Sequence, residues 1–104
     1  MARFDVYTHP DPVERKLIPY LLDVQNSYLD PLSTTVVIPL CKQKMIPNSV
    51  RDLNPVLTIQ GIEVVLNTAE LGPVPSNFLR HPVTNLSSDQ PVIQAALDTL
   101  FGGY

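Results

Sequence analysis

The chain has 104 residues, of which 44% are hydrophobic and 16% are charged, and these values are typical of one globular domain with a modest core. Its formal net charge is −3 at pH 7 and its seven Lys and Arg form no basic stripe, which disfavours nucleic acid as the primary ligand. No apolar run approaches about eighteen residues and the start lacks a signal-peptide segment, so we expect a cytoplasmic protein without a membrane span.

Cysteine and proline usage narrows the fold further. Cys41 is the only cysteine, which excludes an internal disulfide and disfavours a cysteine-rich zinc site. We expect Cys41 to be a small buried or half-buried side chain. Eleven prolines argue against a mostly helical fold and favour short strands with bulges, edges and tight connections.

The first third of the chain predicts two strands. Period-two alternation over Arg3–Thr8 indicates a half-buried strand. A charged loop, His9–Lys16, follows, and the nearly continuous apolar run Ile18–Val24 predicts a second strand, buried on both faces for part of its length. In the polar connection after it, Tyr28 and Leu29 are large and apolar, so they either fold back onto the core or form a surface for a partner.

The middle of the chain is also rich in strands. The β-branched run Thr34–Ile38 predicts a third strand, and Pro39 either ends its pairing or lies at a bulge. The segment Cys41–Asp52 is polar and broken, with room for one short helical turn. Residues 56–66 predict a hairpin whose tight turn is Gln60-Gly61.

The segments that follow the hairpin give weaker signals. Thr68–Leu71 is ambiguous, and the two prolines of Gly72–Pro75 exclude a central strand. Phe78-Leu79 and Val83 are assigned to a further short edge strand.

A helix is expected at the C-terminus, with Ser88 as its N-cap and Pro91 in its first turn. Apolar residues recur at spacings of three and four, which predicts one apolar stripe: Val92, Ile93, Ala96, Leu97, Leu100 and Phe101. The helix stops at Gly102-Gly103, before Tyr104. The last three residues, here called the tip, are either a frayed end or a contact for a partner.

This order of elements indicates the fold class. Five or more mostly antiparallel strands followed by one helix are typical of a mainly β (α+β) domain, a small barrel or curled sheet closed by a terminal helix. We expect a single domain over residues 1–104.

No motif carries a recognisable chemistry. None of the four glycines fits a phosphate-binding loop, and His9 and His81 are far apart, each before a proline. Asp23 is an acid within an apolar strand. Burial would raise the pKa of its carboxyl group, which is one mark of a functional site, whereas the alternative is that Asp23 faces solvent or pairs with a neighbouring group. We therefore expect no catalytic residues, no cofactor and no metal site.

Several stretches together carry a family resemblance. They are Phe4–Tyr7, Tyr20–Gln25, Val37–Leu40, Pro55–Leu57, Thr68–Pro75, Asn85–Ser87, Ile93, Ala96, Leu97 and Phe101–Tyr104. In their order and spacing they resemble the CcdB-type toxins of bacterial toxin–antitoxin pairs. Each stretch is weak alone, but together they cover essentially the whole chain.

The resemblance implies an SH3-like antiparallel barrel with a small extra sheet and a C-terminal α-helix, assembled as a homodimer. Toxins of this family are topoisomerase poisons: they bind the A subunit of DNA gyrase and trap the gyrase–cleaved DNA complex, without catalysis of their own. A CcdA-like antitoxin neutralises the toxin. The two proteins together repress their own operon, and the antitoxin reads the operator DNA.

Site residues also follow from the resemblance. It places the gyrase contacts at Gly102, Gly103, Tyr104, Asp98, Tyr28 and Leu29. The family pattern ends in tryptophan, glycine and isoleucine and carries an uncharged amide on the helix, so Gly102, Tyr104 and Asp98 depart from it. The antitoxin site lies partly on the loop after the first strand, where Arg15 and Lys16 would pair with an acidic antitoxin tail.

Two other functions remain open. A MazF-type endoribonuclease shares the fold and needs cationic groups and a general acid or base, for which His9, Arg15 and Arg51 are the main candidates. A degenerate toxin would bind its antitoxin but not gyrase, and the altered tip is the reason to consider it.

Overall fold

The computed structural model describes residues 2–29 and 32–102 of the chain, with the backbone alone at Leu29. Seven strands and one α-helix lie within these residues. The strands are β1 (Asp5–Thr8), β2 (Tyr20–Asp23), β3 (Thr34–Cys41), β4 (Val56–Ile59), β5 (Ile62–Leu66), β6 (Gly72–Pro75) and β7 (Thr84–Asn85), and the helix is α1 (Gln90–Phe101).

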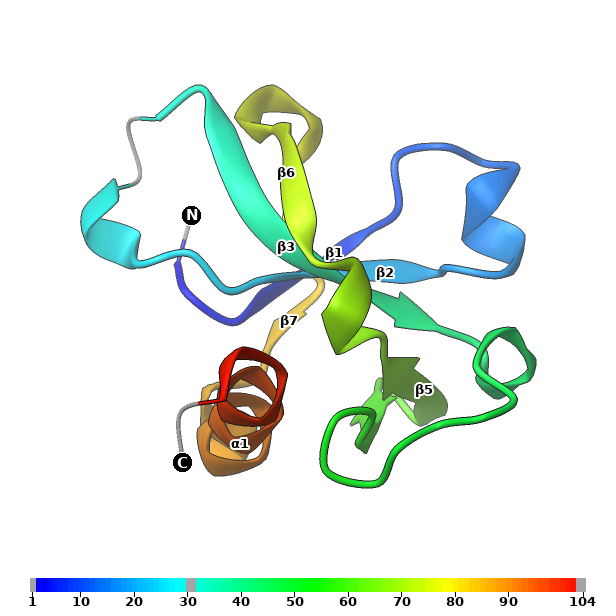
Figure 1. Ribbon diagram of the computed structural model, residues 1–104. Coiled ribbons are helices and arrows are strands. Elements are labelled where there is room, and N and C mark those ends of the chain that lie inside the picture. Colours follow the sequence, from blue (N-terminus) through cyan, green and yellow to red (C-terminus); the bar gives the residue numbers. More distant parts are fainter. Residues whose placement is uncertain (1, 30–31, 103–104) are drawn as a thin grey trace.

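The strands form an antiparallel sheet that curls into a nearly closed barrel, with α1 beside it (Figure 1). Their order is β4-β5-β3-β2-β1-β7, and β6 pairs with β3 off this path. The side-chain amide of Gln60, in the β4–β5 turn, donates to the carbonyl oxygen of Val83 at 3.3 Å, next to β7. This bond links the two ends of the strand order. The predicted mainly β fold with an antiparallel barrel and a C-terminal helix is confirmed.

β3 pairs with three other strands, β2, β5 and β6. Its first four residues pair with β6, residues 37–40 pair with β2, and its last two residues pair with β5. In Figure 1, the first half of β3 and β6 extend from the barrel as a ribbon. β6 is an edge strand, as its prolines required.

Pro39 lies inside β3 without ending it. It pairs with Leu21 of β2, so the alternative in which Pro39 ends the pairing is wrong. Its carbonyl oxygen accepts from the N–H of Asn67 at 3.0 Å, on the side where the partner of β3 changes from β6 to β5. The ring therefore removes an N–H donor where no ladder bond is needed.

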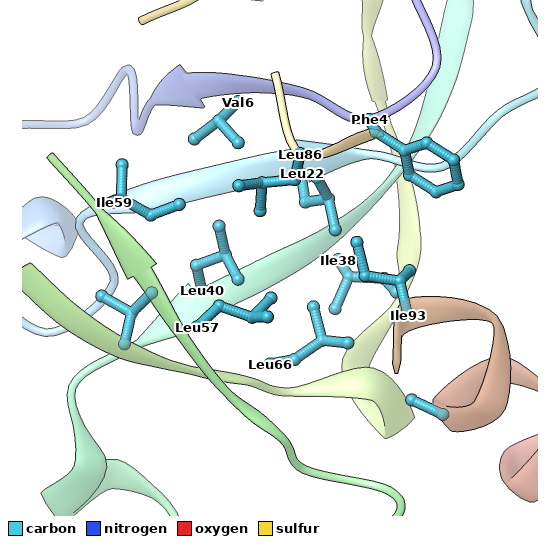
Figure 2. Close-up of a cluster of buried hydrophobic side chains, with 12 residues drawn as sticks. Phe4, Val6, Leu22, Ile38, Leu40, Leu57, Ile59, Leu66, Leu86 and Ile93 are labelled. Atoms are coloured by element: carbon cyan, nitrogen blue, oxygen red, sulfur yellow. The ribbon is translucent and has the colours of Figure 1, made fainter. Parts of the chain in front are cut away.

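The main core lies between the barrel strands and α1 (Figure 2). Ile93 of α1 is fully buried, and burial of one such side chain stabilises the fold by about 1.5–3 kcal/mol. The buried members of this cluster are Phe4, Val6, Leu22, Ile38, Leu40, Leu57, Ile59, Val64, Leu66, Leu86, Ile93 and Ala96.

A second, smaller cluster contains Tyr7, Leu21, Val37 and Leu79. Successive residues of a strand face opposite sides, so Leu22 packs in the main core while Leu21 packs in the second. The prediction that the second strand is buried on both faces is confirmed. The prediction of a half-buried first strand is wrong, because Asp5 and Tyr7 are also buried.

The hairpin of residues 56–66 is confirmed. Gln60 and Gly61 have φ values of 50° and 83°, as a two-residue type I′ turn requires. The broken segment before it contains one short 3-10 turn, Gln43–Met45, as expected. The predicted edge strand at Phe78-Leu79 and Val83 is wrong: Ser76–Phe78 is a 3-10 turn, and the short strand is β7.

The C-terminal helix forms with different limits. Asp89, not Ser88, occupies the N-cap position, because residues 87–89 form a 3-10 turn. The apolar stripe is narrower than expected: Ile93 and Ala96 are buried, but Phe101 is 69% exposed. Within the described part of the chain, no helix is long and apolar enough to cross a membrane.

Candidate functional site

The described end of α1 positions the first residue of the tip. Gly102 has φ 69° and ψ 37°, a left-handed conformation, and its N–H donates to the carbonyl oxygen of Asp98. A glycine adopts this conformation without the strain that a Cβ causes. The predicted helix stop is thus confirmed at Gly102. Gly103 and Tyr104, the other two residues predicted to contact gyrase, lie outside the described residues.

The loop after β2 presents an aromatic side chain. Tyr28 lies in the 3-10 turn Ser27–Leu29 and is 88% exposed, so it does not fold back onto the core. Its backbone N–H donates to Oδ1 of Asn26 at 3.0 Å, which fixes the start of the turn. The side chain of Leu29 lies outside the described residues.

Arg3 connects this loop to α1. Its backbone N–H donates to Oγ of Ser27 at 2.8 Å, and its Nε donates to the carbonyl oxygen of Val24 at 3.3 Å. Its Nη2 donates to Oε1 of Gln94 at 3.4 Å. Two segments of the predicted gyrase surface are therefore joined through one residue, by its backbone N–H and its side chain.

Sequence reasoning missed Arg3 as part of this surface. Strand periodicity placed Arg3 on the polar face, and no spacing rule links it to Gln94, which lies 91 residues away. Its position at the start of the chain, before a buried Phe4, carried no signal of its own.

A groove lies on another part of the surface, between the loop after β1 and β6. It has a volume of about 410 Å³. Leu21, Val37 and Pro39 contribute apolar surface to it, and Phe78 adds an aromatic side chain. We call this the β6 groove. Three acidic residues line it, Asp11, Glu14 and Glu70, and His9 lines it as well.

The predicted antitoxin residues lie in the loop that borders this groove. Arg15 and Lys16 are exposed in the 3-10 turn Glu14–Lys16, and neither lines the β6 groove itself. Nε of Arg15 donates to the carbonyl oxygen of His9 at 2.9 Å, which ties the two ends of the loop together. A partner in the groove would therefore meet apolar and acidic groups inside and cationic groups beside it.

The three residues considered for a ribonuclease are not all brought together in one hollow. His9 lines the β6 groove, whereas Arg51 lines a separate hollow of about 650 Å³ beside the first turn of α1. In the described part of the chain, no three of His, Cys, Asp and Glu lie close enough to hold a metal ion.

Asp23 and Cys41 are buried side chains with hydrogen-bond partners inside the fold. Asp23 is only 2% exposed and its Oδ1 accepts from the backbone N–H of Gln25 at 2.9 Å, so it pairs with a neighbour and does not face solvent. Cys41 is buried, as expected. Burial, chiefly, raises the pKa of its thiol above the ordinary value of 9.0, with a smaller contribution from Glu70 and an opposing hydrogen bond from Asn67.

Comparison with known protein families gives one match that spans nearly the whole chain. The family model described as CcdB protein matches residues 3–103. The matched range includes Arg3, the loop with Tyr28, the β6 groove and α1.

Proposed function

Because the chain belongs to the CcdB family of toxins from toxin–antitoxin systems, we propose that it binds the A subunit of DNA gyrase and traps the gyrase–cleaved DNA complex. The act is binding, and the protein is not an enzyme. In this proposal it acts as a homodimer in the cytoplasm and needs no cofactor.

The exposure of Tyr28 is the observation that supports the proposal most. Tyr28 is 88% exposed on an ordered turn, and tyrosine is one of the residue types that are enriched at binding hot spots. Hydrogen bonds to Asn26 and Arg3 hold its turn in place. Binding therefore requires little further ordering of this loop.

The end of α1 supplies the second part of the surface. Asp98 lies one turn before Gly102, the first residue of the tip. Gly102 replaces the family's tryptophan, so in this chain Tyr28 and Tyr104 carry the aromatic contacts. Asp98 adds a negative charge, which favours a cationic group on the gyrase side.

We also infer a second partner, a CcdA-like antitoxin that folds as it binds. The β6 groove would receive apolar side chains of the antitoxin, and Arg15 and Lys16 beside it would pair with antitoxin carboxylates. Repression of the operon follows from the antitoxin's contact with operator DNA, which agrees with the absence of a basic stripe in this sequence.

The test is DNA cleavage by purified gyrase with ATP and this protein, stopped with detergent. Accumulated linear DNA supports the proposal, and removal of Tyr104 should abolish the signal. No linear DNA, from a folded protein that binds its antitoxin, would contradict gyrase poisoning and favour a degenerate toxin. Cleavage of RNA by the purified protein would favour the MazF-type alternative.

A further inference from the structure

The side-chain amide of Gln94 lies between two opposite charges. Its Oε1 accepts from Nη2 of Arg3 at 3.4 Å, and its Nε2 donates to Oδ1 of Asp98 at 3.1 Å. Reversing the amide would place its NH₂ against the guanidinium and its oxygen against the carboxylate. The two charges therefore fix the direction of the amide, and the amide fixes the Asp98 side chain.

Arg3 itself is held in place by groups other than Gln94. Its guanidinium carbon lies 4.6 Å from the centre of the Phe4 ring, a cation–π contact. Its carbonyl oxygen accepts from Nδ2 of Asn85 in β7 at 3.1 Å. Arg3 is thus held in place independently of Gln94, and it contacts both the loop and α1.

We propose that Arg3 is a positioning residue of the gyrase-binding surface. It orients Asp98 through Gln94, and it holds the turn that carries Tyr28 through Ser27 and Val24. This inference rests on the proposed function. It assigns Arg3 a role that acts through other residues, without requiring that Arg3 touch gyrase.

A double-mutant cycle tests the first half of this inference. Arg3→Ala and Gln94→Met interrupt the same chain of hydrogen bonds to Asp98, and Arg3→Ala also removes the bond to the Val24 carbonyl oxygen. Gln94→Met should weaken binding to the A subunit of gyrase about tenfold, Arg3→Ala should weaken it at least as much, and the double variant should be no weaker than Arg3→Ala. Antitoxin affinity should stay within about twofold in all three. Arg80→Ala is the matched control, because among the described residues the Arg80 guanidinium donates only to the nearby carbonyl oxygen of Asn77.

If the two losses of gyrase affinity multiply in the double variant, to about a hundredfold, Arg3 and Gln94 make independent contacts and the inference is overturned. Unchanged gyrase affinity in Arg3→Ala would also overturn it.

Nitrogen-15 NMR of the free protein tests the same inference without gyrase. Arg3→Ala removes the side-chain bonds to Gln94 and to the Val24 carbonyl oxygen but keeps the backbone N–H bond to Ser27. It should therefore shift the Gln94 side-chain amide towards solvent-exposed values and lower the order parameter of the Tyr28 amide, whereas Arg80→Ala should change neither. If both signals stay as in the wild type, the positioning role is wrong even where gyrase binding is intact. If the NMR changes occur but the wild-type protein does not bind the gyrase protein, the proposed function fails and the contacts of Arg3 stand.

Discussion

Arg15 and His9 are joined across the loop after β1, where Nε of Arg15 lies 2.9 Å from the carbonyl oxygen of His9. The bond uses one of five guanidinium N–H donors and holds the cation beside the acidic β6 groove. A partner that enters the groove meets this loop in an ordered form.

Charge reversal in this loop should weaken antitoxin binding. We expect Arg15→Glu with Lys16→Glu to lower the affinity for an acidic antitoxin peptide at least tenfold at low salt, with a smaller loss at high salt because exposed charges are screened. Isothermal titration calorimetry at two ionic strengths measures this. Lys44→Glu, an exposed cation outside the loop and the groove, is the control. Unchanged affinity in the double variant would contradict the assignment.

Tyr28→Ala and Phe78→Ala form a reciprocal pair. Tyr28→Ala should reduce gyrase affinity tenfold or more, since aromatic hot spots often contribute over about 2 kcal/mol, and should leave antitoxin affinity unchanged. Phe78 is 54% exposed in the β6 groove, so Phe78→Ala should reduce antitoxin affinity and leave gyrase affinity unchanged. Both side chains are exposed, so the free energy of unfolding should change by less than about 0.5 kcal/mol in each variant. Equal losses for both partners in either variant would argue against two separate surfaces.

Gly102→Ala should destabilise the end of α1. The left-handed conformation at φ 69° costs an alanine about 1 kcal/mol, although a Cβ there would meet no atom of the described residues within 4 Å. Gly72→Ala is the matched control, because that site is equally open and has no positive φ. Urea unfolding of both variants measures the difference. A loss at Gly72 as large as that at Gly102 would show that backbone conformation is not the cause.

Cys41 should make stability fall at alkaline pH. Its pKa is raised in the folded protein, so the folded state keeps the proton while the unfolded thiol ionises. The stabilising effect is complete below the unfolded value of about 9 and is lost as the pH rises from there through the folded pKa. Urea unfolding between pH 8 and pH 10 should show this decrease, and Cys41→Ala should remove that part of it. If the free energy of unfolding falls equally steeply with pH in the wild type and in Cys41→Ala, Cys41 is not the cause.

Local patterns predicted the strand-rich part of the fold because its signals lie within a few residues. The Gln60-Gly61 turn and the apolar run before Asp23 needed only short-range chemistry. Pro39 was misjudged because a proline's effect depends on which side of the strand its missing N–H would face, and that is decided by β5 and β6, far along the chain. Ser88 was misjudged because a preceding 3-10 turn moved the cap by one residue.

The candidate site was harder to predict from the sequence than the fold was. Tyr28 stood out as a large side chain in a polar loop, but its exposure depended on the fold. The contact of Arg3 with Gln94 joins the two ends of the chain, and no local pattern encodes it. The assignment of the site to gyrase came from the family resemblance and stays a prediction.

The order of synthesis gives the placement of α1 a further consequence. Ile93 and Ala96 complete the main core, and the ribosome makes them after the seven described strands of the barrel. The barrel of a nascent chain therefore lacks part of its core until α1 has emerged. The surface proposed for gyrase includes Asp98 of α1, so it too forms only after every strand of the described barrel has been made.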